Sequence, residues 1–182
     1  KSYTCNQFSL SSERPMIGFC PGAEFGPAKR WPHYHYAELA KQLIDEGYQV
    51  VLFGSAKDHE AGNEILAALN TEQQAWCRNL AGETQLDQAV ILIAACKAIV
   101  TNDSGLMHVA AALNRPLVAL YGPSSPDFTP PLSHKARVIR LITGYHKVRK
   151  GDAAEGYHQS LIDITPQRVL EELNALLLQE EA

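Results

Sequence analysis

The feature that most constrains this chain is its alternation of short, wholly apolar runs with longer stretches of helical periodicity. Apolar runs lie at residues 16–20, 50–54, 98–101 and 117–121, and segments with apolar residues every three or four positions separate them. Strands that are apolar throughout are typical of a parallel sheet covered by helices on both faces. The pattern therefore predicts an α/β fold with a doubly wound, Rossmann-like parallel sheet.

Weaker signals complete the expected order of elements. Two further strands are expected within residues 76–80 and at 137–142, and helices between Pro32 and Gly47 and at 58–69, 86–95, 104–113 and 166–178. Residues 1–14 are polar with little periodicity, so we expect a linker or a loosely packed segment there. Residues 15–182 would form one domain.

Composition and charge narrow the class of protein. The chain has 182 residues, a formal net charge of −4 and no apolar run approaching the ~20 residues that cross a bilayer. An acidic balance argues against broad nucleic-acid binding, so a phosphate ligand must be held by helix ends and a few placed cations. The four cysteines form no C-x-x-C pair, which favours free thiols in a reducing, cytoplasmic compartment.

The stretch Thr101–His108 is the strongest candidate for a binding site. An apolar strand ends there in small polar residues, and Asp103 and Ser104 are good helix N-cap types. The free N–H groups and dipole of a helix N-terminus attract anions, and His108 would lie one turn further along the helix. Taken alone, the stretch fits an ordinary capped helix equally well.

Ligands of doubly wound sheets bind beyond the carboxyl ends of the strands, which here selects the loops at 21–31, 54–58, 81–85 and 101–108. The first loop carries Lys29 and Arg30, which are either phosphate ligands or solvated surface cations. Its spacing matches neither a P-loop nor G-x-G-x-x-G. Gly54 would let the backbone at Ser55 approach a nucleotide closely.

Other aromatic residues and motifs of the sequence point to no binding or catalytic role. Trp31 is expected to pack beneath the first loop, and His33 and His35 are expected at the surface without a role. The motifs assemble no Ser-His-Asp elbow, H-E-x-x-H helix or carboxylate pair, so no catalytic site and no divalent metal are indicated.

Three motifs in order resemble the ADP-heptose:lipopolysaccharide heptosyltransferases of glycosyltransferase family 9. They are the runs P-G-A-E-F-G-P-A-K-R-W-P at 21–32, N-D-S-G-L-M-H-V-A-A-A-L at 102–113 and A-L-Y-G-P-S-S-P at 119–126. The family has the GT-B fold, in which two Rossmann-like domains face a cleft. The chain resembles the C-terminal, donor-binding half, which implies that the N-terminal acceptor domain is absent from this sequence.

The resemblance implies inverting transfer of L-glycero-D-manno-heptose from ADP-heptose to the first heptose of the lipopolysaccharide inner core, without a cofactor. Lys29, with Arg30, would contact the donor phosphates and stabilise the leaving group. Thr84 would lie near the adenine and ribose, and the donor-binding set would be completed by Ser55, Asp103, Ser104, Gly105 and His108. Asp103, as a carboxylate, would cap the helix or bind a sugar hydroxyl rather than phosphate.

In this family the catalytic base is an Asp of the N-terminal domain, so the resemblance implies that the chain alone binds ADP weakly and transfers no sugar. Two alternatives stay open: another GT-B nucleotide-sugar enzyme, transferase or epimerase, and a non-catalytic nucleotide-binding module. The basic cluster at 146–150 would contact acceptor phosphates or the cytoplasmic face of the inner membrane, or form a solvated loop.

Overall fold

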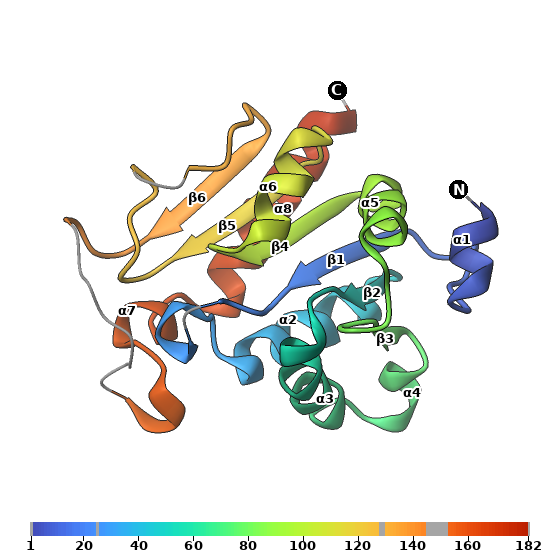
Figure 1. Ribbon diagram of the computed structural model, residues 1–182, viewed down its shortest axis with the longest axis horizontal. Coiled ribbons are helices and arrows are strands. Elements are labelled where there is room, and N and C mark those ends of the chain that lie inside the picture. The colour runs from blue at the N-terminus through green and yellow to red at the C-terminus, as the bar shows by residue number, and fades with distance from the viewer. Residues whose placement is uncertain (1, 25, 128–129, 145–152, 182) are drawn as a thin grey trace.

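The computed structural model describes residues 2–24, 26–127, 130–144 and 153–181. Within them lies a six-stranded sheet of order β3-β2-β1-β4-β5-β6, in which every neighbouring pair is parallel (Figure 1). The strands are β1 (Met16–Cys20), β2 (Gln49–Leu52), β3 (Cys77–Asn79), β4 (Ala98–Asn102), β5 (Leu117–Tyr121) and β6 (Ala136–Arg140). This order, which reverses between β1 and β4, confirms the predicted doubly wound Rossmann-like sheet.

Helices cover both faces of the sheet (Figure 1). One face carries α2 (His33–Asp45), α3 (His59–Ala67) and α8 (Pro166–Glu181); the other carries α5 (Leu86–Ala95) and α6 (Gly105–Ala112). Shorter pieces connect them: α1 (Ser2–Gln7), α4 (Thr71–Gln74), α7 (Gln159–Ile162) and the 3₁₀ turns η1 (Pro27–Lys29), η2 (Ala56–Asp58) and η3 (Ala154–Gly156).

Side chains of each strand alternate between two hydrophobic cores, as the pleat requires. In β1, Ile17 and Phe19 join the core beneath α2 and α8, while Met16 and Cys20 join the core beneath α5 and α6. Every residue of β1, β2, β4 and β5 is buried. This two-sided burial explains why these strands read as continuous apolar runs rather than alternating ones.

The segment 1–14 differs from the loose segment expected there. Residues Ser2–Gln7 form α1, which packs against α5, and Leu10 is buried in the adjoining core. The Gln49 side chain donates to the carbonyls of Ser11 and Arg14 at 2.6 and 2.7 Å. A polar segment is thus held by hydrogen bonds to its backbone, which hydrophobic periodicity does not report. The basic cluster at 146–150 lies outside the described residues.

The described helices include none that is long and apolar enough to cross a bilayer.

A buried amide joins the two strands at which the sheet order reverses. Asn102, the last residue of β4, is fully buried, and its Oδ1 accepts from the Trp31 backbone N–H at 3.0 Å and the Tyr36 hydroxyl at 2.8 Å. Its Nδ2 donates to the carbonyls of Pro21 and Gly22 at 2.7 and 3.2 Å. The loop after β1 is therefore fixed to the end of β4 by one side chain.

Replacing Asn102 with Asp tests this arrangement, because a carboxylate keeps the acceptors but cannot donate to the two carbonyls. We expect the free energy of unfolding to fall by roughly 3–5 kcal/mol, the cost of a buried charge beside unpaired carbonyls. Urea unfolding followed by circular dichroism measures it. Asn174→Asp, the same change on the exposed face of α8, is the control and should be nearly neutral. Equal stability of the two variants would contradict the role of Asn102.

Candidate functional site

A cavity of about 440 Å³ opens at the carboxyl ends of β1, β2 and β4, where the strand order reverses. Its wall comes from the loop after β1, the turn after β2 and the first turns of α5 and α6. The lining residues are Cys20, Gly22, Ala23, Glu24, Phe53, Gly54, Ser55, Lys57, Asp58, Leu86, Ser104, Gly105, Leu106 and Val109. Position and size suit a small-molecule ligand.

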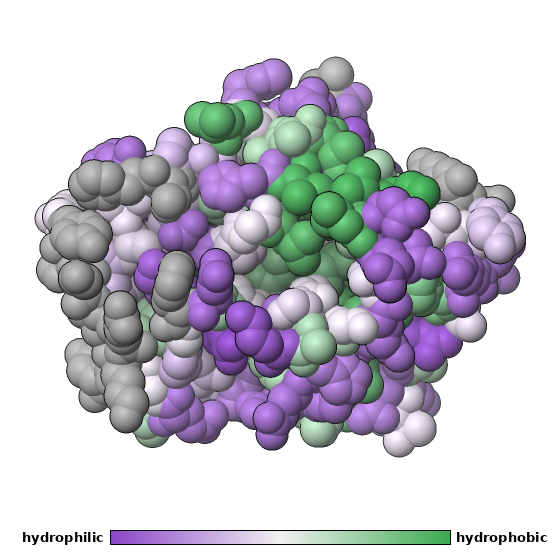
Figure 2. Space-filling view, in the orientation of Figure 1, coloured by the Kyte–Doolittle hydropathy of each residue, from purple (hydrophilic) through white to green (hydrophobic). Residues whose placement is uncertain are grey.

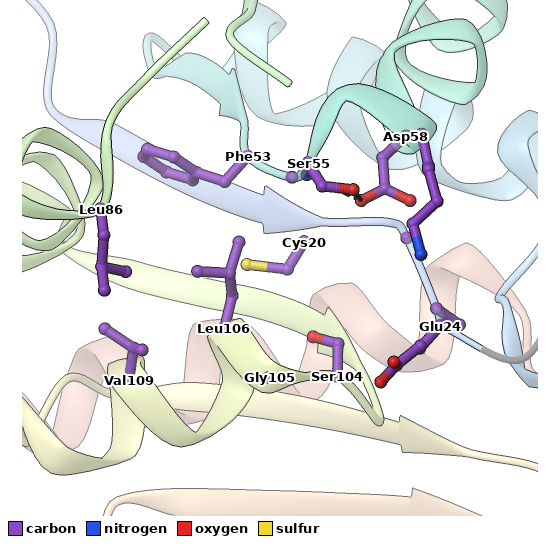
Figure 3. A pocket seen from close by; sticks show the side chains of 14 residues that line it. Cys20, Glu24, Phe53, Ser55, Asp58, Leu86, Ser104, Gly105, Leu106 and Val109 are labelled. Atoms are coloured by element: carbon purple, nitrogen blue, oxygen red, sulfur yellow. Dashed lines mark hydrogen bonds between the residues drawn. The ribbon is translucent and has the colours of Figure 1, made fainter. Parts of the chain in front are cut away.

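The cavity has an apolar half and a polar half (Figure 3). Phe53, Leu86, Leu106 and Val109 gather at one end, whereas Ser55, Asp58, Glu24 and Ser104 lie at the other. Apolar side chains also gather on the surface over α5 and α6 (Figure 2), and Leu86 at the cavity edge is 68% exposed. A ligand with one flat apolar part and one polar or charged part would match this division.

Asp58 organises the polar half. Its Oδ2 accepts from the Ser55 backbone N–H at 2.9 Å and from the Ser55 hydroxyl at 3.1 Å. Its Oδ1 lies 3.8 Å from the Arg30 guanidinium. The carboxylate fits against Gly22, since a Cβ on that glycine would come within 2.2 Å of Asp58 Oδ1. A larger residue at position 22 would therefore have to displace the Asp58 carboxylate.

The N-terminus of α6 points its first backbone N–H groups toward the cavity wall formed by Ser104 and Gly105. Ser104 occupies the cap position, but its side chain makes no hydrogen bond to the first turn and lies instead 3.4 Å from the Thr101 hydroxyl. A Cβ on Gly105 would meet nothing within 4 Å, so the space in front of this turn is open. A helix N-terminus beside open space is the kind of position at which proteins bind anions.

The structure brings only some of the predicted donor-binding residues to this cavity. Ser55, Ser104 and Gly105 line it. Lys29 and Arg30 are half-buried in and after η1 and do not line it, although Arg30 pairs with Asp58 of its wall. Thr84 and Asp103 are half-buried in the turns before α5 and α6. His108 is exposed on α6, and Leu106 and Val109 of the same helix line the cavity instead.

Arg30 and Lys57 share a second hollow of about 290 Å³, named here the polar hollow. It is lined by Pro27, Arg30, Lys57, Glu60, Ala61, Glu64, Glu155 and Tyr157. Lys57 lines both the cavity and the polar hollow, and the Arg30–Asp58 ion pair joins their walls. Two cations therefore lie where the polar half of the cavity continues outward.

Trp31, His33 and His35 lie beneath the C-terminal segment of the chain. Trp31 is buried, and its indole N–H donates to the Ile164 carbonyl at 2.8 Å, which confirms a packing role. His33 and His35 were expected at the surface, but both are half-buried. His35 Nε2 lies 2.7 Å from the Ile162 carbonyl, and burial lowers its pKa. The C-terminal segment that covers them lies more than a hundred residues away in sequence, so local pattern could not reveal it.

The apolar half and Lys57 were not predicted from sequence. Phe53 closes an apolar strand and Leu86 opens an amphipathic helix, so each fits a purely structural role. The available signal was position, because both residues sit at carboxyl-edge junctions. Among the described residues, no group of three metal-ligating side chains lies in the cavity wall.

Cys20 forms part of the cavity floor but is not a reactive thiol. It is 1% exposed, and burial raises its pKa to about 12, only partly opposed by the hydrogen bond with Thr101. Cys77 is similarly buried, with its pKa raised to about 12. The described cysteines are free thiols, as predicted.

Alkylation tests this environment. With iodoacetamide at about pH 8, we expect Cys20 and Cys77 to react roughly a thousandfold more slowly than an exposed thiol of ordinary pKa, because so little thiolate is present. Half-buried Cys5 is the internal comparison and should be labelled first. Peptide mass spectrometry gives the rates. Labelling of Cys20 as fast as Cys5 in the folded chain would contradict the burial.

Comparison with known proteins gives consistent matches. Residues 1–158 match the profile of the family described as glycosyltransferase family 9 (heptosyltransferase). Lipopolysaccharide heptosyltransferase 2 of Salmonella typhimurium is 92% identical over 180 residues, which cover 99% of this chain and 52% of that protein.

Solved structures agree. The E. coli ADP-heptose lps heptosyltransferase II superposes with a TM-score of 0.93 at 94% identity, covering all of this chain and 52% of that one. A family 9 glycosyl transferase from Veillonella parvula gives 0.82 at 31% identity, covering 98% and 50%. The chain thus spans about half the length of the curated relatives it matches.

Proposed function

The chain belongs to glycosyltransferase family 9, and on that basis we propose that its cavity binds ADP-heptose as the donor of a heptosyltransferase. The observation that carries the proposal is the divided cavity, which offers an apolar slot beside the N-terminus of α6, a helix that the Ser104 side chain does not cap. ADP has the matching division, with a flat base at one end and a diphosphate at the other. Family resemblance and cavity chemistry thus favour the same ligand.

The apolar half would hold the adenine. Phe53, Leu106 and Val109 supply walls without charge, and exposed Leu86 would cover the base from the rim. The ribose would then reach the polar half, where carboxylates such as Glu24 accept hydrogen bonds from sugar hydroxyls. Because both oxygens of Asp58 already face Ser55 and Arg30, the charge of Asp58 is largely balanced.

The diphosphate would lie at the α6 N-terminus, facing Lys29, Arg30 and Lys57. As the anomeric bond breaks, negative charge grows on the leaving diphosphate, so fixed cations and backbone N–H groups there stabilise the transition state more than the ground state. This half of the enzyme would activate the leaving group, with Asp103 and His108 nearer the sugar. No metal or cofactor is part of the proposal.

The acceptor side completes the proposed reaction. The heptose would pass, with inversion, to the first heptose of the lipopolysaccharide inner core, and the base would be an Asp of an N-terminal domain. Relatives about twice as long as this chain have room for such a domain. An acceptor anchored in lipid would bring the protein to the cytoplasmic face of the inner membrane. The isolated chain would bind donor and transfer no sugar.

Calorimetry with ADP tests the phosphate side. We expect Lys29→Ala and Lys57→Ala each to weaken ADP binding about tenfold, because each removes a charge-assisted contact with the diphosphate. Lys97→Ala removes the same charge at the opposite edge of the sheet and should leave the affinity unchanged. Equal affinity of wild type and Lys29→Ala would reject the assignment of Lys29.

Leu86→Ser tests the base side. We expect it to weaken ADP binding several-fold, because the base loses apolar cover, while pyrophosphate binding stays the same. Leu132→Ser, at a position 82% exposed and outside the cavity, is the matched control. A thermal-shift panel of ADP-, UDP- and GDP-sugars measures base preference. Stronger stabilisation by UDP- or GDP-sugars would favour another GT-B enzyme. If none of the nucleotide sugars stabilised the chain, the proposal that it binds a nucleotide-sugar donor would be rejected.

A further inference from the structure

A histidine and two glutamates from three separate segments meet at the edge of the polar hollow. Among the described residues they are the one group whose three possible metal-ligand atoms all lie within 4.8 Å of one another. His33 begins α2, Glu64 lies on α3 and Glu155 lies in η3. His33 Nδ1 is 3.1 Å from Glu64 Oε2 and 3.6 Å from Glu155 Oε2.

These separations match the edges of a metal coordination shell. Zinc binds imidazole nitrogen at about 2.0–2.1 Å and carboxylate oxygen at about 2.0–2.2 Å, so neighbouring ligand atoms of a tetrahedral site lie about 3.3–3.5 Å apart. The two measured edges bracket this value. Small rotations of the two half-exposed glutamates would complete the shell without movement of the backbone.

The surroundings leave room for a fourth ligand. Glu64 and Glu155 both line the polar hollow, so a water could reach the ion from that side. The Tyr157 hydroxyl accepts from the His33 backbone N–H at 3.2 Å and lies 2.7 Å from His33 Nδ1. It therefore fixes the start of α2 and, without an ion, the imidazole. A bound ion would take the Nδ1 lone pair in place of the hydroxyl, which would keep its bond with the His33 backbone N–H.

The donor set indicates the class of ion. One imidazole with two carboxylates suits first-row transition ions such as Zn²⁺, whereas Mg²⁺ and Ca²⁺ prefer sites made only of oxygen. Without an ion, the two carboxylates face one imidazole that carries at most one positive charge. A divalent ion would neutralise the charge of both carboxylates. Partly exposed ion pairs with a single imidazole stabilise them only weakly.

We propose that His33, Glu64 and Glu155 bind a divalent transition-metal ion, with zinc as the reference, that ties residues 153–157 to α2 and α3. The ion would be structural and outside the donor cavity. The ion would hold in place the segment 153–157, which packs closely against the first loop. A Cβ on Gly156 would come within 2.7 Å of Pro27 Cγ. The proposal is independent of which nucleotide sugar the cavity binds.

Zinc calorimetry on the tag-free, chelator-treated chain tests the proposal. We expect saturable binding of one zinc ion per chain, weakened by about tenfold or more in His33→Ala, Glu64→Gln and Glu155→Gln. Glu60→Gln, on the same helix and in the same hollow, and His134→Ala, on a distant exposed turn, are the controls and should bind like wild type. Co²⁺ substitution should give visible absorption bands that Glu155→Gln loses.

Thermal melting separates a metal site from a purely structural cluster. Zinc should raise the Tm of wild type and of both controls but not of the three ligand variants, because only a native-state site gives this linkage. Glu155→Gln changes an exposed side chain and should fold normally, so the test survives if His33→Ala does not fold. Absence of saturable binding, or equal zinc affinity in Glu60→Gln and Glu64→Gln, would overturn the proposal.

Discussion

The buried amide of Asn102 is the interaction on which the rest of the site depends. It links the end of β4 to the backbone of the first loop through three hydrogen bonds, and to the Tyr36 hydroxyl of α2 through a fourth, at the point where strand order reverses. Every doubly wound sheet has a crevice there, because the connections from the two central strands leave in opposite directions. Here both walls of the crevice are fixed by Asn102. Its side chain holds Gly22 on one wall, and its backbone leads into the turn before α6 on the other.

Local sequence predicted the frame of the fold for a physical reason. The bounds of β1, β5 and α5 agree with the expected ranges because two-sided burial and helical amphipathicity are written in adjacent residues. The helix at residues 2–7 was missed, since it is held by packing against α5, and the chain after it by burial of Leu10 and hydrogen bonds from Gln49 to Ser11 and Arg14. Tertiary contacts of this kind leave no periodic trace.

The residues of the site likewise fall into those that local sequence predicts and those that tertiary contacts place. Ser55, Ser104 and Gly105 could be predicted because they follow strands and face the carboxyl edge. The pairing of Arg30 with Asp58 could not, because the sheet edge brings their two loops together without saying which side chains pair. The meeting of His33 with Glu155 could not either, because only the folded chain brings those segments together. The fixed charges around the cavity thus come from long-range contacts, while its backbone donors come from local ones.

The contacts between the first loop and the end of the chain bear on the order of events during synthesis. Trp31 bonds to the Ile164 carbonyl and His33 to Tyr157, across sequence separations of 133 and 124 residues. Contacts of such range close late, because a long loop must be ordered before they form. Before residues 157–164 are added, the hydrogen bonds of Asn102 can already hold the first loop to the end of β4. The wall that carries Arg30 would therefore be completed in two stages, first against the end of β4 and later against residues 157–164, when α8 also joins the core.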